Sequence, residues 1–237
     1  PDAVTGNLKF DNAPNASLQA LGRSWRTRIG RPVVLAASTR EGEEVLVRDA
    51  WRRCASRAAG IVPAPLLVIV PRHPQRFDDV VRQADAAGFA VARRAALDEA
   101  APAIDWTAVD LLVGDSMGEM DAWYALADCA VIGGSLLPFG SQNLIEACAA
   151  GCPVLVGPST FNFAEAAAQA IEAGAARPVD DADAAIETAI ALLADPVAAA
   201  AMAAAGERFA GLHRGATRRT LDALAPMLTR ALGRPPA

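Results

Sequence analysis

The feature of this sequence that most constrains its fold is the alternation of short apolar runs with amphipathic stretches. The runs are continuously apolar, which is typical of strands that are covered on both faces of a sheet. Most of the stretches between them carry apolar residues at the spacing of a helix that buries one side. This alternation predicts an α/β fold with a Rossmann-like, doubly wound parallel sheet. The expected strands are 32–39, 65–71, 89–93, 109–115, 129–134 and 153–157.

Helical patterns account for most of the remaining chain. The alanine-rich stretch 182–210 is good helix-forming sequence, so we interpret it as packed helix. The opening residues are rich in turn formers, and we expect residues 1–30 to be a linker that leads into a single domain, residues 31–237. The expected helices are 42–58, 76–87, 118–127, 142–150, 164–173, 182–193 and 196–232.

Composition excludes several classes of protein. The net charge of −5 argues against nonspecific nucleic-acid binding, which requires basic residues that displace counterions. No apolar run approaches the roughly 20 residues of a membrane-spanning helix, so we expect this part of the protein to be soluble. The cysteines lack the C-x-x-C spacing and neighbouring histidines of a zinc site, so buried thiols in a reducing compartment are expected, with no metal. They are Cys54, Cys129, Cys148 and Cys152.

Ligands of doubly wound folds bind where the carboxyl ends of the strands lead into helices. The first expected strand ends in "STREGEE" (38–44), where Ser38 and Thr39 either cap the next helix or contact a ligand. The second ends in "PRHPQRF" (71–77), where Arg72 and His73 lie between two prolines. The guanidinium of Arg72 is suited to a phosphate or a carboxylate.

Two later junctions carry further candidates. The stretch "GDSMGEM" (114–120) places Gly118 and Glu119 at a helix start, where they either serve the cap or contact a base or ribose. The stretch "GGSLLPFGSQNLIEA" (133–147) contains Asn143 and Glu146, which share one side of a helix because they are three residues apart. A carboxylate there can accept hydrogen bonds from ribose hydroxyls, although a capping arrangement is the alternative.

These stretches together resemble the bacterial Kdo transferases, the 3-deoxy-D-manno-octulosonic acid transferases of lipopolysaccharide assembly. The similarity extends over roughly residues 4–175. It implies that this chain is the C-terminal, donor-binding domain of a two-domain GT-B glycosyltransferase, with the N-terminal acceptor domain outside the chain. The matching motifs are "VTGNLKFD" (4–11), "STREGEE", "VPRHPQRF" (70–77), "GDSMGEMDAWYALADCAVIGGSL" (114–136) and "PVLVGPSTFNF" (153–163).

The resemblance also implies a reaction. The family transfers Kdo from CMP-Kdo to a lipid A precursor with inversion and without a metal or other cofactor. Its acidic catalytic base and its membrane anchor belong to the N-terminal half, so no catalytic residue is assigned in this chain. The full-length protein is expected at the cytoplasmic face of the bacterial inner membrane.

The residues that contact the donor are carried over by motif. The matches for cytidine monophosphate are Pro71, Arg72, Met117, Gly118, Glu119, Asn143, Leu144, Ile145 and Glu146. Further candidates for donor contact are Lys9, Ser38, Thr39, His73, Gly134 and Ser135. The chain departs from the family pattern at Arg40, where a histidine is usual, and at Ser141 and Gln142, where Gly-His is usual.

Two other functions remain open at this point. A nucleotide-sugar epimerase of GT-B-like fold also reads a ribose with a helical glutamate, but it would bind a uridine diphosphate sugar. A non-catalytic nucleotide-binding module is the second alternative. An NAD-dependent oxidoreductase is disfavoured because no glycine triad follows the first expected strand.

Overall fold

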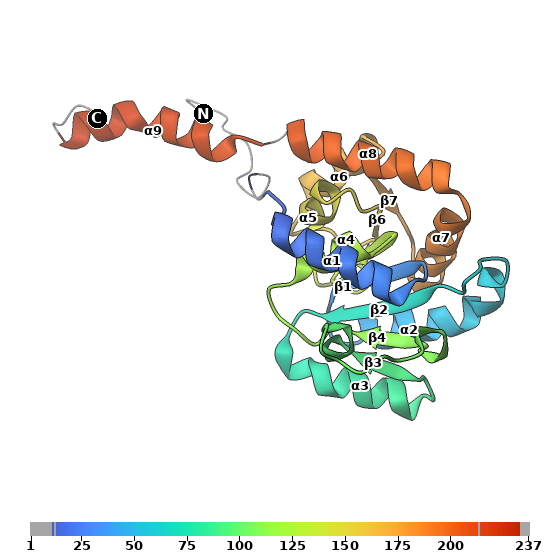
Figure 1. The fold of residues 1–237 in the computed structure, drawn as a ribbon. Helices are drawn as coiled ribbons and strands as arrows, with labels where there is room; N and C mark the ends of the chain where they lie inside the picture. The colour runs from blue at the N-terminus through green and yellow to red at the C-terminus, as the bar shows by residue number, and fades with distance from the viewer. Residues whose placement is uncertain (1–10, 12, 213, 233–237) are drawn as a thin grey trace.

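The computed structural model describes residues 11, 13–212 and 214–232. Within them, seven strands form a single parallel sheet at the centre of the molecule (Figure 1). The strands are β1 (Val33–Thr39), β2 (Leu66–Pro71), β3 (Val91–Arg93), β4 (Leu111–Val113), β5 (Cys129–Ile132), β6 (Val154–Val156) and β7 (Ala176–Pro178). Their spatial order is β3-β4-β2-β1-β5-β6-β7, so the chain builds outward from β1 to one edge and then returns to build the other. The predicted doubly wound sheet is confirmed.

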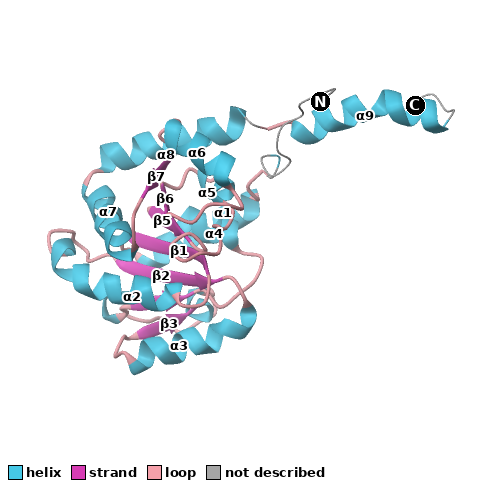
Figure 2. Ribbon diagram, turned by 180° about the vertical axis from the view of Figure 1, so that it is seen from behind, coloured by secondary structure: helices cyan, strands magenta, loops and turns pink. Residues whose placement is uncertain are grey.

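Helices cover both faces of this sheet (Figure 2). The α-helices are α1 (Ala16–Ile29), α2 (Glu43–Cys54), α3 (Phe77–Ala86), α4 (Met120–Leu126), α5 (Leu144–Ala149), α6 (Ala164–Glu172), α7 (Ala182–Ala194), α8 (Pro196–Leu212) and α9 (Ala216–Leu232). Short 3-10 turns are η2 (Ala55–Ala58), η3 (Pro74–Arg76), η4 (Arg94–Leu97) and η5 (Trp106–Ala108). Helices α1, α4, α5, α6 and α8 pack on one face, and α2, α3 and α7 on the other.

The sheet core follows from the continuous apolar runs. Along β1, Val33 and Leu35 face one cluster while Val34 faces the other, because successive side chains of a strand point to opposite faces. Both clusters are covered by helices, so the positions of β1 from Val33 to Ala37 are all apolar. The expected buried thiols are also found, since all four cysteines are free and buried.

The structure contains one strand that was not predicted, and it divides one of the expected helices. Strand β7 was not predicted, because its three residues lack an apolar run and pair only with β6 at the edge of the sheet. The helix expected over 196–232 is divided into α8 and α9. Gly215, just before α9, has φ +89°, a left-handed value incompatible with continuing a helix. Helix α9 then extends away from the rest of the molecule (Figure 1).

The linker expected over residues 1–30 is wrong for residues 16–29, which form α1. Asn15 caps this helix by accepting hydrogen bonds from the backbone N–H groups of Ser17 and Leu18. Trp25 is almost fully buried and lies with its ring centroid 4.7 Å from that of Trp123 in α4. Helix α1 is therefore part of the domain core.

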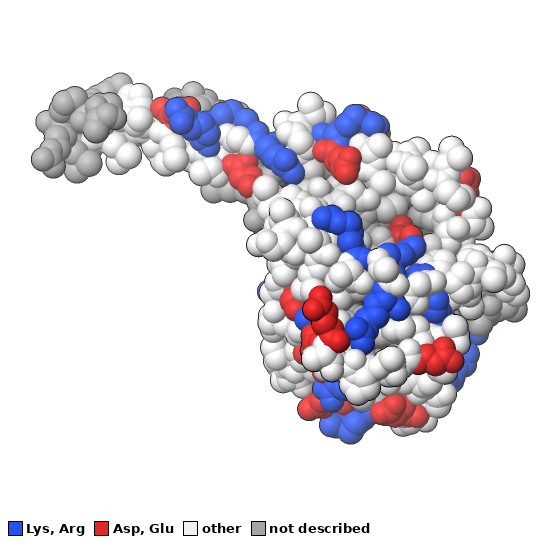
Figure 3. All heavy atoms as spheres, viewed as in Figure 1, with Lys and Arg blue, Asp and Glu red and all other residues white. Residues whose placement is uncertain are grey.

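Basic side chains gather on the surface over α1 (Figure 3). Two arginines of α1 hold the helix in place. Arg26 pairs with Asp128, which also accepts a hydrogen bond of 2.7 Å from the Val33 N–H at the start of β1. Arg28 donates to the carbonyl oxygen of Ala101 at 3.0 Å. These contacts lie at the amino ends of the strands, far from the edge where the strands end.

Within the described chain, no single helix has both the length and the apolar character needed to cross a membrane. One bent pair that includes α7 meets these criteria only when both of its helices are combined.

The close contact between α1 and α4 gives a stability prediction. A Cβ on Gly22 would overlap the carbonyl oxygen of Ala122 and lie 2.9 Å from the Cβ of Ala125. Gly22→Ala should therefore lower the free energy of unfolding by about 1–3 kcal/mol, because the helices must separate. Urea denaturation measures the change.

Gly211 in α8 provides the matched control, since its Cβ would meet no atom within 4 Å. Gly211→Ala should be neutral or stabilising by up to about 1 kcal/mol, as expected from helix propensity alone. Equal effects of the two substitutions would contradict the close approach of α1 and α4.

Candidate functional site

A cavity of about 270 Å³ opens at the carboxyl edge of the sheet, where β1, β2, β4 and β5 end. Parallel strands bring these four loops to one edge although they are far apart in the sequence. The cavity is lined by Ser38, Val70, Pro71, Arg72, Ser116, Met117, Gly118, Glu119, Met120, Tyr124, Gln142, Asn143 and Glu146.

The ends of β1 and β2 form one wall of the cavity. Ser38 has φ +57°, a left-handed conformation unusual for a residue with a side chain, and its hydroxyl donates to the sulfur of Met120 at 3.7 Å. The Arg72 N–H donates to the carbonyl oxygen of Thr39 at 2.9 Å, which fixes the two strand ends together. Pro71 is buried, whereas the Arg72 side chain is exposed at the mouth.

A tight turn after β4 forms the opposite wall. A Cβ on Gly114 would lie 2.6 Å from Val70 and 2.9 Å from the ring of Trp123, so only glycine fits there. Gly118 has φ +79°, and a Cβ on it would meet no atom within 4 Å. The turn therefore exposes backbone toward open space, followed by Glu119 at the N-terminus of α4.

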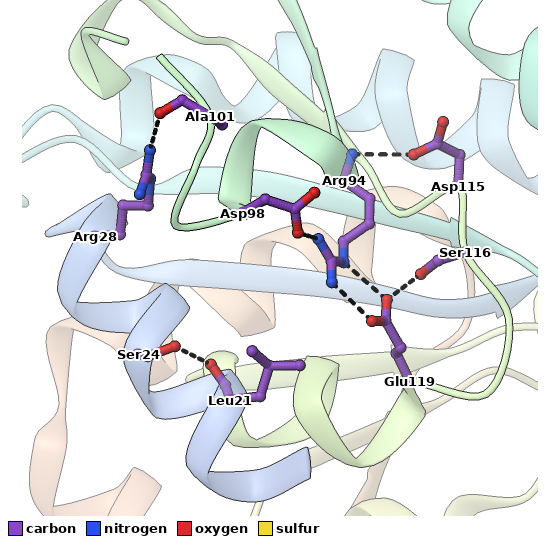
Figure 4. A network of polar contacts seen from close by, with 9 residues as sticks. All are labelled: Leu21, Ser24, Arg28, Arg94, Asp98, Ala101, Asp115, Ser116 and Glu119. Atoms are coloured by element: carbon purple, nitrogen blue, oxygen red, sulfur yellow. Dashed lines mark hydrogen bonds and ion pairs between the residues drawn. The ribbon is translucent and has the colours of Figure 1, made fainter. Parts of the chain in front are cut away.

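Glu119 is held by a network of polar contacts (Figure 4). The Arg94 guanidinium donates to both of its carboxylate oxygens at 2.8 Å, and Ser116 donates a further hydrogen bond. Arg94 also pairs with Asp98, and its guanidinium lies 4.6 Å from the ring centroid of Trp25. A bidentate arginine gives the carboxylate a defined orientation.

This network shifts the proton affinities of both partners. Burial acts to raise the pKa of Glu119, but hydrogen bonds from Arg94 and Ser116 outweigh it and hold that pKa below its ordinary value. The hydrogen bond to Glu119 is also the main cause of the raised pKa of Arg94. Glu119 is therefore an anion at neutral pH with its charge largely engaged inside the protein.

The start of α5 forms the floor. Asn143 is the N-cap, and its Oδ1 accepts a hydrogen bond of 3.1 Å from the Ile145 N–H. Its Nδ2 donates to Oε1 of Glu146 at 3.0 Å. Asn143 thus caps the helix and also lines the cavity, so the capping alternative raised from the sequence does not exclude a ligand contact there. Burial, together with the charge of Glu146, raises the pKa of Tyr124 well above its ordinary value.

The structure brings together most of the residues expected to contact a ligand. Seven of the nine motif-matched positions and Ser38 line the cavity. The side chains of Leu144 and Ile145 instead pack in the core, so only their backbone is available to a ligand. That these residues contact the donor stays a prediction.

Other candidates lie behind the cavity rather than on its lining. Thr39 is buried and donates to Glu44 at 3.1 Å, and the hydroxyl of buried Ser135 donates to the Ile132 carbonyl oxygen. The Gly134 N–H donates to Glu43 at 2.6 Å. His73 precedes the turn η3 and is not part of the lining. Lys9 lies outside the described residues.

Sequence reasoning missed several lining residues and one supporting residue. Val70, Met120 and Tyr124 were read as core or helix, and nothing in their pattern distinguishes them from buried residues. Gln142, noted only as a departure from the family, lines the cavity. Arg94 immediately follows β3, so the strand-end rule, applied there as well, would have found it.

Across the part of the chain that the structure describes, no three side chains of histidine, cysteine, aspartate or glutamate are grouped as a metal site requires.

The Glu119 network predicts a pH dependence. Its pKa is lower in the folded chain than the value of about 4.3 expected when unfolded, so the ionised carboxylate stabilises the fold at neutral pH. This contribution should be lost as the pH falls below about 4. Glu119→Gln should be less stable than the parent at pH 7, with a gap that narrows toward pH 3.

Urea denaturation at both pH values measures this gap. Glu172→Gln, at an exposed position of α6, is the control and should give little difference at either pH. A Glu119→Gln gap that stays constant down to pH 3 would contradict the lowered pKa.

Comparison with known proteins identifies close relatives. Residues 93–209 match the family described as Glycosyl transferases group 1. The 3-deoxy-D-manno-octulosonic acid transferase of Bordetella pertussis is 51% identical over 223 residues, covering 93% of this chain and 50% of that protein. The enzyme of the same name from Haemophilus influenzae is 34% identical over 230 residues, covering 96% and 52%. The chain thus spans about half the length of the curated relatives it matches.

Solved structures agree with this relationship. The C-terminal CMP-Kdo binding domain of WaaA from Acinetobacter baumannii superimposes with a TM-score of 0.73 and 27% identity, covering 82% of this chain and 98% of that one. Anabaena Alr3699/HepE in complex with UDP-glucose has a TM-score of 0.59 over 95% of this chain and 56% of that one, and its 15% identity shows a shared fold only. The chain is therefore an α/β domain of GT-B fold that is similar to the 3-deoxy-D-manno-octulosonic acid transferases over about half of their length.

Proposed function

We propose that this chain is the donor-binding half of an inverting Kdo transferase and that it binds CMP-Kdo in the cavity at the carboxyl edge of the sheet. The observation that carries the proposal is the convergence of the donor motifs. Arg72, Gly118 and Glu146 follow three different strands, yet they line one cavity. The relation to an Acinetobacter domain described as binding CMP-Kdo supports the same ligand.

Arg72 suits the phosphate of the donor. Its exposed guanidinium lies at the mouth of the cavity, where it can form two parallel hydrogen bonds to phosphate oxygens. When the bond to Kdo breaks, negative charge builds up on the departing CMP. A fixed cation beside the phosphate stabilises that charge and so favours departure.

Glu146 and the turn after β4 suit the nucleoside. Glu146 is half-buried at the first turn of α5, where Asn143 orients its carboxylate through a hydrogen bond of 3.0 Å. Such a carboxylate can accept hydrogen bonds from the two ribose hydroxyls. Gly118 leaves room for the base or the ribose to approach the backbone, because its surroundings are open.

The remaining steps of the reaction require the rest of the protein. Since the chain spans about half of its relatives, we assign the catalytic base, the lipid A precursor site and the membrane association to the other half. Lipopolysaccharide assembly at the cytoplasmic face of the inner membrane follows from the same proposal. This chain alone should bind donor and transfer nothing.

Nucleotide preference tests the function. The chain should bind CMP more tightly than UDP in calorimetric titrations, because the proposed donor is a cytidine monophosphate sugar. Absence of CMP binding at millimolar nucleotide would refute the proposal. Preference for UDP would instead favour the epimerase of GT-B-like fold, and CMP binding without transfer by the full-length protein would favour a non-catalytic module.

Two substitutions distinguish the contribution of the phosphate to binding from that of the ribose. Arg72→Gln should weaken CMP about 10-fold or more and leave cytidine unchanged, because only CMP carries the phosphate. Glu146→Gln should weaken CMP and cytidine by similar factors, also about 10-fold. Each variant serves as the control of the other, and calorimetry with both ligands measures the four changes. If Glu146→Gln left both affinities unchanged, Glu146 would be part of the helix cap only.

A further inference from the structure

A buried carboxylate that does not line the cavity lies at the start of α2. The sequence motifs assigned it no ligand. Glu43 is the first residue of α2 and is 0% exposed. An ionised side chain at such a position is costly unless hydrogen bonds replace its lost water. The contacts of Glu43 therefore indicate why a carboxylate is retained there.

Glu43 accepts hydrogen bonds from the backbone of two different loops. Its Oε2 accepts from the N–H of Arg40 at 2.8 Å and of Gly134 at 2.6 Å. Its Oε1 accepts from the N–H of Leu136 at 3.0 Å, with a longer contact of 3.4 Å from Leu137. The side chain thus joins the loop after β1 to the loop after β5.

The second of these loops, residues 133–142, leads directly into the floor of the cavity. Its two ends are paired, because the Ser141 N–H donates to Gly134 and the Gln142 N–H donates to Gly133 at 2.7 and 2.8 Å. Ser141 has φ +70°, a strained conformation for a residue with a side chain. The loop therefore contains one residue, Ser141, in a conformation that its side chain does not favour.

We propose that Glu43 is a positioning residue for donor binding: it holds the 133–142 loop in the conformation that places Gln142, Asn143 and Glu146 in the cavity. This inference rests on the proposed binding of CMP. Glu43 acts through the loop and does not line the cavity itself.

The chemistry of the contact requires an ionised carboxylate. A carboxylate is acceptor-only, with lone pairs enough for all of these N–H groups, and charge-assisted bonds to it are the strong ones. Its place at the N-terminus of α2 also favours negative charge. A glutamine has the same shape, but its NH₂ group would face backbone N–H groups and repel them.

The adjacent residue provides a matched control. Glu44 is also buried, but it accepts a hydrogen bond from the Thr39 hydroxyl at 3.1 Å and lies 3.7 Å from the Arg76 guanidinium, and both of these partners are outside the 133–142 loop. Burial raises the pKa of Glu44 above its ordinary value.

The test compares Glu43→Gln with Glu44→Gln in the 237-residue chain. Glu43→Gln should weaken CMP about 10-fold, equivalent to about 1.4 kcal/mol, while Glu44→Gln changes affinity less than about 2-fold. When Glu146→Gln is already present, Glu43→Gln should reduce the affinity for CMP by a smaller factor, because one of the side chains that the loop positions has already lost its role. Full additivity of the two substitutions, or equal loss in both glutamine variants, would overturn the proposal.

Amide hydrogen exchange gives a second readout, which does not need CMP. In the folded parent the N–H groups of Gly134 and Leu136 should be protected, and Glu43→Gln should increase their exchange without affecting the amides of α1. Rapid exchange of these two groups in the parent would overturn the proposal even if the variant fails to fold. Failure of the parent to bind CMP would refute the proposed function, whereas normal binding by Glu43→Gln would refute only the role of Glu43.

Discussion

The structure depends on parallel pairing of β1 with β2 on one side and with β5 on the other. Parallel pairing points the carboxyl ends of all three strands to the same edge, and helices on both faces exclude water from the strands. The loops at that edge are then the available place for polar groups. The cavity lies there because the chain reverses its direction of sheet growth at β1.

Close backbone contacts make this edge compact. A Cβ on Gly133 would overlap the backbone of Ser38, and one on Gly157 would overlap that of Ser135, so the loops can touch only because these residues are glycines. The charged side chains at this edge differ in whether they are engaged inside the protein. Glu119 is engaged by Arg94 and Glu43 by backbone amides, while Arg72 is exposed at the mouth, where an anionic ligand can reach it.

Much of the fold and of the site could be predicted from the sequence, and the misses have physical causes. The core strands were predictable because burial on both faces requires a run of apolar residues. Strand β7 lies at the edge of the sheet, pairs only with β6 and has no such run. Helix α1 was missed because many of its residues are polar, so its sequence did not indicate that Trp25 is buried. Tyr124 was missed because its place in the cavity depends on how α4 packs, whereas Arg94 was missed because the strand-end rule was not applied to β3.

The sequence by itself determined the fold class, the strand ends that carry polar groups and the resemblance to Kdo transferases, since periodicity and short motifs are local properties of the chain. Only the tertiary structure decided which of those polar groups share a cavity and which are engaged elsewhere. Thr39 and Ser135 look like ligand contacts in the sequence, yet their hydroxyls donate hydrogen bonds to buried groups of the protein. Glu43 looks like an ordinary helix-start residue, and its hydrogen bonds to a loop some 90 residues away exist only after folding. Such distinctions depend on contacts between distant segments, which local patterns do not contain.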